Sequence, residues 1–228
     1  MLSEEDLVGI IDELAKILEE KQDIIQSVDW IPSFSLQPPF VLYEERERVL
    51  GISSAVLKPV YKAVYQECMR YVSSVKSVDH QESCRLATSR WEIHSLSKIT
   101  LLIKGDLSFI YNLRKKLLIE DPNLIPHEIP FTSLVFSKHP KSPSGWEHRR
   151  FCYKLKHRME NKLKLLPMEL VTEQELCRRS ADAYPKNYYA WMHRLWLLQF
   201  FSFSQVSPIY PINWFRIIFR CSWKKSQN

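Results

Sequence analysis

The feature of this sequence that most limits its fold is a motif that occurs twice, 45 residues apart. The segment HPKSPSGWEHRRFCYKL at 139–155 aligns with YPKNYYAWMHRLWLLQF at 184–200, and both keep a Pro-Lys pair and a Trp-x-His-Arg sequence. A segment with helical character precedes each motif, TSLVFSK in one case and TEQELCRRSADA in the other. Helix pairs that recur every ~35–45 residues are typical of an α-solenoid. The spacing therefore predicts an all-α chain of stacked helical hairpins.

A fainter copy of the motif lies upstream, in GDLSFIYNLRKKLL at 105–118. At an offset of 35 residues, Tyr111 takes the place of the tryptophan and Arg114 the place of the arginine. We number the copies in chain order, so that copy 1 contains Tyr111, copy 2 contains Trp146 and copy 3 contains Trp191. The repeats are expected to fill residues 51–200, between an acidic N-terminal region (1–50) and a divergent aromatic tail (201–228).

The residues that recur are expected to hold the fold together. On a helix, Trp191 and Arg194 share a face, where an aromatic ring can fill the seam between helix pairs and a guanidinium can reach carbonyls or carboxylates of the next layer. A catalytic group rarely recurs at the same repeat position. We therefore assign packing and hydrogen-bonding roles to the whole set: Tyr111, Arg114, Trp146, His148, Arg149, Trp191, His193 and Arg194.

Lys186 and Tyr188 precede the core of the third motif, at the expected start of a helix. A helix N-terminus favours anions, and lysine is a point charge suited to phosphate. An exposed lysine beside a half-buried tyrosine is an equally good description of the same residues. Both interpretations stay open from the sequence.

The motifs PKNYYAWMHRLW and PKSPSGWEHRRF resemble the repeat of the protein prenyltransferase α-subunit family, roughly P-x-N-Y-x-x-W-x-H-R-x-W. The resemblance covers about residues 50–199 and implies a right-handed α-α superhelix wrapped around a separate β subunit. It implies that the β subunit carries the zinc and the prenyl diphosphate, so that this chain binds no cofactor and has no catalytic residue. The chain alone is then expected to be inactive.

The resemblance also implies that one lysine and one tyrosine lie near the isoprenoid diphosphate. Lys186 and Tyr188 match those types in copy 3. Lys141 matches the lysine in copy 2, but Ser142-Pro143 replaces Asn-Tyr there. Which copy contacts the diphosphate is left open by the sequence.

The faint first copy makes the chain most similar to an orphan α-type member of the family. Such a subunit is expected to pair with the β subunit of Rab geranylgeranyltransferase type and to support geranylgeranylation of cysteines in cytosolic proteins. The family pattern leads us to expect further repeats after residue 199, and the sequence there departs from it. Competence for β-subunit pairing is therefore open.

Composition excludes several other classes. The 4 glycines and 13 prolines argue against a glycine-rich phosphate loop, and the cysteines, at 68, 84, 152, 177 and 221, form no CxxC. No HExxH occurs, so zinc ligation within this chain is not expected. An odd cysteine count, an acidic start and no apolar run of the ~20 residues that span a bilayer favour a cytoplasmic protein without a membrane span.

Charge is distributed unevenly along the chain. Residues 1–50 contain 12 Asp/Glu against 4 Lys/Arg, while the remainder contains 14 against 28. A basic body with an acidic N-terminal region suits an acidic or phosphorylated partner, or simply a solvated surface. The basic stretch 138–164 raises an RNA-binding alternative, but its only aromatics are Trp146, Phe151 and Tyr153, at least the first of which is better used in a core, and no nucleic acid is expected.

The remaining segments are assigned by periodicity and breakers. Ser3 and Asp6 predict a capped helix over about 4–26, followed by a proline-rich extended segment at 30–40. Apolar spacing predicts a helix over 53–75, kinked or begun at Pro59, and a further helix from Asp79 to about Ile103. A tetratricopeptide-like scaffold, also with a repeat near 34 residues, is the principal non-enzymatic alternative.

Overall fold

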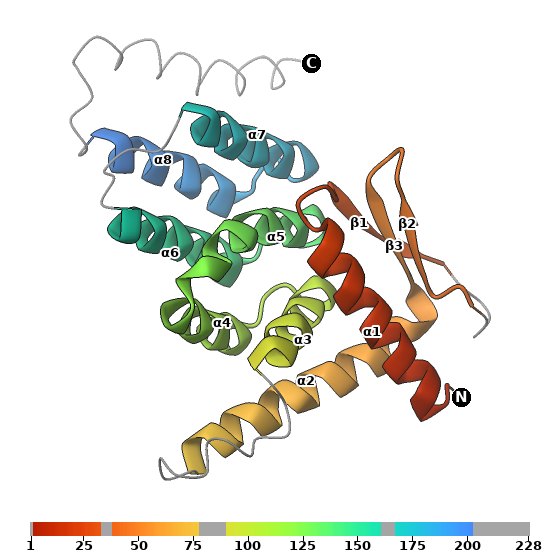
Figure 1. The fold of residues 1–228 in the computed structure, drawn as a ribbon. Helices are drawn as coiled ribbons and strands as arrows, with labels where there is room; N and C mark the ends of the chain where they lie inside the picture. The colour runs from red at the N-terminus through yellow and green to blue at the C-terminus, as the bar shows by residue number, and fades with distance from the viewer. Residues whose placement is uncertain (1, 33–37, 78–89, 161–166, 203–228) are drawn as a thin grey trace. The chain divides into compact units, whose positions relative to one another are not determined.

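The computed structural model describes residues 2–32, 38–77, 90–160 and 167–202. The chain divides into two compact units, Met1–Lys156 and His157–Asn228. The elements, labelled in Figure 1, are α1 Glu4–Lys21, β1 Ser27–Ile31, β2 Val41–Glu44, β3 Val49–Ser53, α2 Ser54–Ser77, α3 Arg90–Ile103, α4 Ser108–Glu120, the 3-10 turn η2 Pro122–Leu124, α5 Ile125–Lys138, α6 Pro143–Glu160, α7 Pro167–Ala183 and α8 Tyr188–Ser202.

The predicted all-α class is confirmed for the repeats. From Ser54 to Ser202 the described segments are helices with short connections, and each motif copy lies on the second helix of a pair: α4, α6 or α8. The pairs follow from the breakers between them, since Gly105, Pro140 and Pro185 each stand just before a motif helix.

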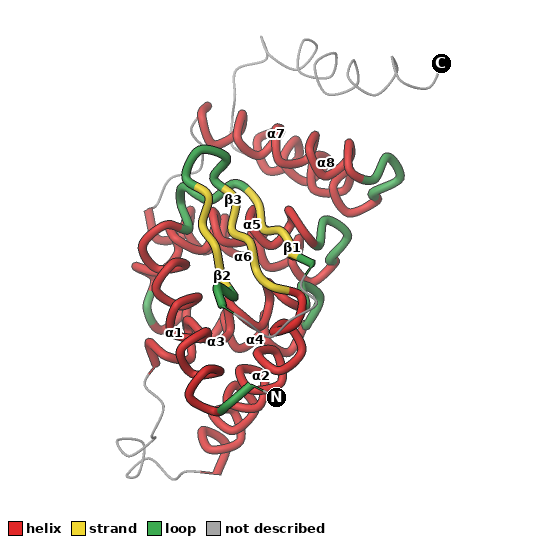
Figure 2. Tube along the Cα trace, turned by 90° about the vertical axis from the view of Figure 1, so that its right-hand side faces the viewer, coloured by secondary structure: helices red, strands yellow, loops and turns green. Residues whose placement is uncertain are grey.

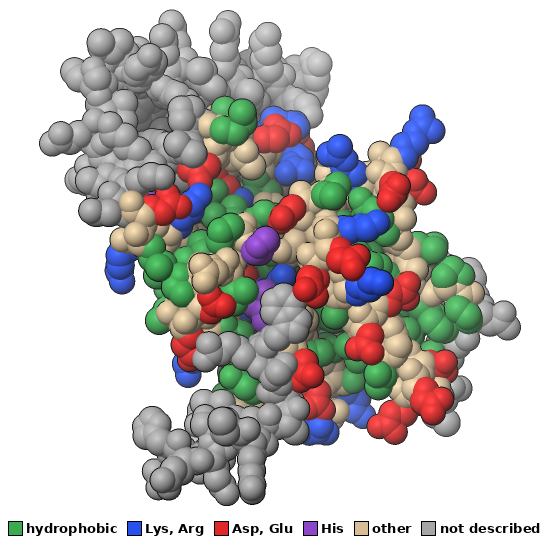
Figure 3. Space-filling model, viewed as in Figure 1, with side chains coloured by type: hydrophobic (Ala, Val, Ile, Leu, Met, Phe, Trp, Pro, Cys, Tyr) green, Lys and Arg blue, Asp and Glu red, His purple; other side chains and the backbone are tan. Residues whose placement is uncertain are grey.

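The first helix has the predicted capping box. The amide of Asp6 donates to Ser3 Oγ over 3.0 Å and the amide of Ser3 donates to Asp6 Oδ2 over 3.0 Å. These hydrogen bonds lower the pKa of Asp6. Helix α1 buries Ile10, Leu14 and Leu18 and turns its acidic side chains outward, as Figure 3 shows. The acidic character of residues 1–50 is thus largely that of a solvated helix face.

A three-stranded sheet follows α1 and was not predicted from the sequence. Its order is β1-β3-β2, with β1 parallel and β2 antiparallel to β3. Helix α1 ends at Lys21, earlier than the predicted residue 26, because the chain turns there and enters β1 at Ser27. The extended segment predicted at 30–40 thus begins inside a strand, while its residues 33–37 lie outside the described part (Figure 2).

The sheet is held against the end of α5. The amide of Val28 donates to Ser137 Oγ over 3.1 Å, and Lys138 Nζ lies 2.7 Å from Asp29 Oδ1. The Lys138 ammonium also lies 5.4 Å from the centre of the Trp30 ring. The sheet is therefore tied to a repeat helix by a hydrogen bond, an ion pair and a cation–π contact.

Helix α2 confirms the predicted stripe, because Val60, Val64 and Cys68 are buried and Val72 is partly buried. Pro59 neither begins the helix nor precedes it, since α2 starts at Ser54 and Pro59 lies inside it. The predicted start of the next helix at Asp79 falls outside the described residues. The described helix α3 ends at Ile103, where the periodicity placed its end.

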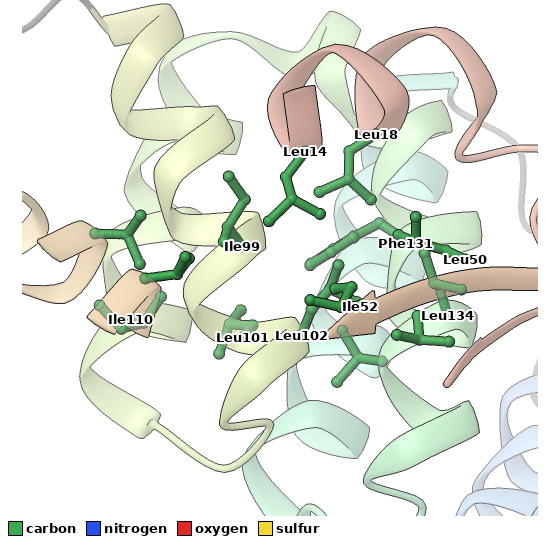
Figure 4. Packing of buried hydrophobic residues seen from close by; sticks show 14 of the residues in the cluster. Leu14, Leu18, Leu50, Ile52, Ile99, Leu101, Leu102, Ile110, Phe131 and Leu134 are labelled. Carbon is green, nitrogen blue, oxygen red and sulfur yellow. The ribbon is translucent and has the colours of Figure 1, made fainter. Parts of the chain in front are cut away.

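One hydrophobic core joins these elements of the first unit. Figure 4 shows Leu14 and Leu18 from α1 converging with Ile99 of α3 and Phe131 of α5 beside Ile52 of β3. The N-terminal helix and the sheet therefore pack into the same core as the repeat helices. The second unit contains α7 and α8, packed against each other.

Candidate functional site

The motif helices share one hydrogen bond that shows the copies to be structurally equivalent. Trp146 Nε1 donates to the carbonyl of Pro140 over 2.9 Å, and Trp191 Nε1 donates to the carbonyl of Pro185 over 3.4 Å. In copy 1 the Tyr111 hydroxyl donates to the carbonyl of Gly105 over 3.1 Å. Each acceptor lies six residues upstream, so a tyrosine hydroxyl replaces an indole N–H without loss of the bond.

The residue before each of the two later motif helices is an N-cap. The amide of Gly145 donates to Ser142 Oγ over 2.9 Å, and the amide of Ala190 lies 3.4 Å from Asn187 Oδ1. Serine and asparagine are both strong N-cap residues. The exchange of asparagine for serine in copy 2 therefore preserves the start of the helix.

The motif arginines of copies 1 and 2 hold the first helix of their own pair. Arg114 Nη1 donates to the His94 carbonyl (2.9 Å) and to Ser97 Oγ (2.6 Å). Arg149 Nη1 donates in the same way to the Ile129 carbonyl and the Thr132 hydroxyl, with the same 20- and 17-residue spacings. Both arginines are fully buried.

The motif histidines pair with glutamates that the sequence reasoning did not single out. His148 Nε2 lies 2.7 Å from Glu128 Oε1, and His193 Nε2 lies 2.8 Å from Glu173 Oε2. All four side chains are fully buried. A signal was available, because the two glutamates are 45 residues apart, the same distance as the two tryptophans.

Copy 1 replaces this pair by two apolar residues. The positions 35 residues before Glu128 and His148 are Ile93 and Leu113, and both are buried in the hydrophobic core. Tyr111, Arg114 and their hydrogen bonds remain. The sequence of copy 1 therefore departs from the motif, but its side chains keep a complete packing scheme.

Arg114 also binds the next pair of helices. Its Nε donates to Glu128 Oε1 over 2.7 Å and its Nη2 donates to Glu128 Oε2. The guanidinium therefore binds the carboxylate through two hydrogen bonds. His94 Nε2 lies 4.0 Å from the same carboxylate. Arg114 thus makes the kind of contact to the next layer that the sequence analysis expected of Arg194.

The positive and negative charges in this buried cluster balance each other, and no proton has to move between its side chains. Burial would raise the pKa of Glu128, but the Arg114 charge and the hydrogen bonds from His148 and Arg114 hold it well below its usual range. Burial lowers the pKa of His148, against the pull of Glu128. Burial and the Arg114 charge lower the pKa of His94 to about 2. The cluster thus contains one anion, one cation and neutral imidazoles, an arrangement suited to structure.

Trp191 departs from the expectation that it fills a seam as Trp146 does. Trp146 is fully buried and stacks on Phe136, with ring centroids 4.1 Å apart at 15°. Trp191 is partly exposed. The equivalent of Phe136, 45 residues on, is Ala181, which offers no ring to stack on.

The expected diphosphate-proximal residues lie at the surface beside the N-caps. Lys186 and Lys141 are exposed and stand one residue before Asn187 and Ser142. Tyr188 begins α8, is 63% exposed and touches Tyr189 edge to face at 5.5 Å. None of the three belongs to the buried motif cluster. The structure therefore separates a structural set of motif residues from an exposed set at the helix starts.

A carboxylate already occupies the N-terminus of α6. Asp106 Oδ1 accepts from Ser142 Oγ (3.2 Å) and from the amide of Ser144 (3.3 Å). Such a carboxylate satisfies the helix start in the way an anionic ligand would.

The described residues also bear on other kinds of site. Within them no three or more His, Cys, Asp or Glu side chains are grouped so as to hold a metal ion. No helix in the described ranges is long and apolar enough to cross a membrane. Trp146 and Tyr153 are buried, so two of the three aromatics in the basic stretch are withdrawn from base stacking.

Comparison with known proteins agrees with the repeat geometry. The family model "Protein prenyltransferase alpha subunit repeat" matches residues 125–155 and 170–201, which cover α5–α6 and α7–α8. Similar curated proteins are named "Protein prenyltransferase alpha subunit repeat-containing protein 1" in Danio rerio (29% identity over 71% of this chain and 38% of the relative) and Homo sapiens (27%, 71% and 40%). A Xenopus laevis relative, "repeat-containing protein 1-A", is 27% identical over 71% of this chain and 37% of its own length. The chain thus spans about two fifths of the length of these relatives.

Proposed function

Because this chain belongs to the family of proteins built from the protein prenyltransferase alpha subunit repeat, we propose that it acts as an α-type subunit of a protein prenyltransferase. Its partner would be a separate β subunit of the Rab geranylgeranyltransferase type, which would hold the zinc and the prenyl diphosphate. The pair would transfer a geranylgeranyl group to cysteines of cytosolic proteins.

One observation carries this proposal more than any other. Lys186 and Tyr188 flank the capped start of α8 and present their side chains to solvent, while the motif residues around them are used in packing. A lysine ammonium beside a helix N-terminus attracts a diphosphate through its own charge and the helix dipole. Lys186 would then stabilise the charge that develops on the leaving diphosphate, without transferring a proton.

The choice between copies 2 and 3 favours copy 3. Asp106 lies at the start of α6 beside Lys141, so an incoming diphosphate would meet a carboxylate there. The start of α8 is preceded by Asn187, a neutral cap. We therefore assign the diphosphate contact to Lys186 and Tyr188, with Lys141 outside it.

The proposed location is the cytoplasm, where thiols stay reduced. Cys68, Cys152 and Cys177 are buried. Burial raises the pKa of Cys68 to about 11, which makes that thiol a poor nucleophile at neutral pH. These thiols serve as packing residues and not as acceptors of a prenyl group.

Co-expression with candidate β subunits, scored for a one-to-one complex, followed by single-turnover prenyl transfer, tests the proposal. Lys186→Ala should slow transfer by roughly 10- to 100-fold, the range for losing one stabilising charge, and Tyr188→Phe should cost less. Lys141→Ala and Lys154→Ala, which change exposed lysines elsewhere, should leave the rate unchanged. Failure to form any complex, or normal transfer by Lys186→Ala in an intact complex, rejects the proposal.

A further inference from the structure

The turns that precede the two later motif helices are built in the same way. The amide of Ser142 donates to the carbonyl of His139 over 3.1 Å, and the amide of Asn187 donates to the carbonyl of Tyr184 over 2.9 Å. Each bond closes a four-residue turn with a Pro-Lys pair at its two central positions. The common types of such a turn differ by a flip of the central peptide, which changes the φ of the third residue. The direction of the lysine side chain therefore depends on how the peptide between proline and lysine is oriented.

A tryptophan holds that central peptide in copy 3. The carbonyl of Pro185 belongs to the peptide that joins Pro185 to Lys186, and it accepts the indole N–H of Trp191 over 3.4 Å. The hydrogen bond that closes the turn uses the carbonyl of Tyr184 and does not involve this peptide. The Trp191 ring is itself held at its face, because the guanidinium of the buried Arg194 lies 5.2 Å from its centre. One aromatic ring thus connects a buried side chain of α8 to the backbone of Lys186.

The same bond contributes differently in copies 2 and 3. Trp146 is fully buried and donates to the carbonyl of Pro140 over 2.9 Å, whereas Trp191 is partly exposed and its bond is longer. A hydrogen bond that water can replace adds little to the free energy of unfolding. The bond of Trp191 is therefore worth less to stability than that of Trp146, although it lies next to the lysine assigned to the diphosphate.

We propose that Trp191 is a positioning residue for Lys186: its indole N–H fixes the peptide between Pro185 and Lys186 and so directs the lysine toward the prenyl diphosphate. This inference rests on the proposed function, because it takes over the role assigned there to Lys186. A charge that is already in place when the diphosphate leaves lowers the barrier more than a charge that must first be ordered. The contribution of Trp191 to the reaction then passes entirely through Lys186.

Two variants of Trp191 that differ by one hydroxyl test the proposal. Trp191→Phe keeps an aromatic ring without a donor. Trp191→Tyr supplies a hydroxyl, and in copy 1 the hydroxyl of Tyr111 donates to the carbonyl of Gly105, six residues upstream, over 3.1 Å. In the complex with the β subunit, at saturating prenyl diphosphate, Trp191→Phe should slow single-turnover transfer by roughly 3- to 10-fold, while Trp191→Tyr should stay within about two-fold of wild type.

Three further measurements separate positioning from a structural role. In the Lys186→Ala background, Trp191→Phe should cost nothing more, because no ammonium remains to be placed. Trp146→Phe removes the equivalent bond from copy 2 and should lower the temperature of unfolding more than Trp191→Phe does, but leave the transfer rate unchanged. In the free chain, NMR relaxation should show a more mobile Lys186 amide in Trp191→Phe than in wild type, and Trp191→Tyr should restore its order.

The outcomes distinguish this inference from the proposed function. Equal transfer rates for Trp191→Phe and Trp191→Tyr, beside a slowed Lys186→Ala, overturn the inference and leave the proposed function standing. An additional loss from Trp191→Phe in the Lys186→Ala background, or an unchanged Lys186 amide, equally overturns it. Normal transfer by Lys186→Ala, or the absence of any complex, rejects the proposed function and this inference with it.

Discussion

His193 Nε2 lies 2.8 Å from Glu173 Oε2, twenty residues upstream, and this contact reproduces that between His148 and Glu128 in the preceding repeat. The repeat is therefore defined by buried polar contacts as much as by its tryptophans. Because such contacts are costly to break singly, they make the fold open to direct tests of stability.

Removing Glu128 should be among the most destabilising single changes in the chain. Glu128→Gln leaves the buried Arg114 without its counter-ion, and we expect a loss of roughly 3–5 kcal/mol in the free energy of unfolding. The paired change Arg114→Met with Glu128→Leu should recover most of this loss, since apolar residues of similar volume often replace a buried ion pair at little cost. Urea denaturation measures both. A double variant less stable than Glu128→Gln would contradict the expectation.

The two motif tryptophans should differ in their contribution to stability. Trp146→Ala removes a fully buried ring stacked on Phe136 and should cost roughly 3–5 kcal/mol. Trp191→Ala removes a partly exposed ring and should cost clearly less. Thermal unfolding of the two variants gives the comparison, and equal losses would show that Trp191 is packed as tightly as Trp146.

Stability should fall as the pH drops below about 6.5. Burial and the nearby Arg114 charge lower the pKa of His94 from 6.5 to about 2, and burial lowers that of His148 as well. The unfolded chain therefore takes up protons that the folded chain refuses, which favours unfolding as pH decreases. Glu128 also reduces stability as the pH falls, but at lower pH than the histidines, because its pKa in the folded state lies below the ordinary value.

Unfolding by urea at pH 7.5 and pH 5 measures this slope. The variant His148→Gln removes one of the titrating groups while keeping a donor toward Glu128, so its stability should change less between the two pH values. Identical slopes for wild type and variant would show that folding does not lower the pKa of His148.

Lys98 offers a test in the opposite pH range. It is buried, donates to Gln22 Oε1 over 2.6 Å and faces Arg114 on α4, Glu128 on α5 and Asp23 and Glu19 near the end of α1. Burial and the Arg114 charge lower its pKa from 10.5 to about 8. Because the pKa of Lys98 is lower in the folded chain, burying its charged form reduces the free energy of unfolding by the full amount below pH 8. This reduction becomes progressively smaller between pH 8 and 10.5.

The contribution of Lys98 should therefore favour folding progressively more between pH 8 and 10.5, by at most about 3 kcal/mol, and Lys98→Met should remove this contribution from the pH profile. At neutral pH the same variant should be as stable as wild type or more so, since it no longer buries a charge. Lys154→Met, at an exposed position, is the matched control and should keep the wild-type profile. A strong loss of stability in Lys98→Met at pH 7 would contradict this account.

The repeat spacing was enough to place the motif helices, because Trp146 and Trp191 with their upstream prolines fix both the start of each helix and its buried face. The sheet could not be found in this way, since its central strand β3 pairs with β1 across more than 20 residues and Gly51 interrupts its apolar run. The Glu–His pairs were missed because the sequence comparison stopped at the motif, although Glu128 and Glu173 recur at its period. The exposed Lys186 and Tyr188 were placed correctly at a helix start, but exposure alone does not identify a ligand.

The apolar pair Ile93 and Leu113 in the first repeat has a consequence for how such arrays diverge. An isolated histidine or glutamate in either place would leave a buried polar group unmatched, so a change at one position makes the other untenable. The residues at the two positions must therefore be substituted together, so that a polar pair is replaced by an apolar pair. Sequence decay in this array then proceeds by correlated steps, and a repeat can lose its recognisable signature while its architecture survives intact.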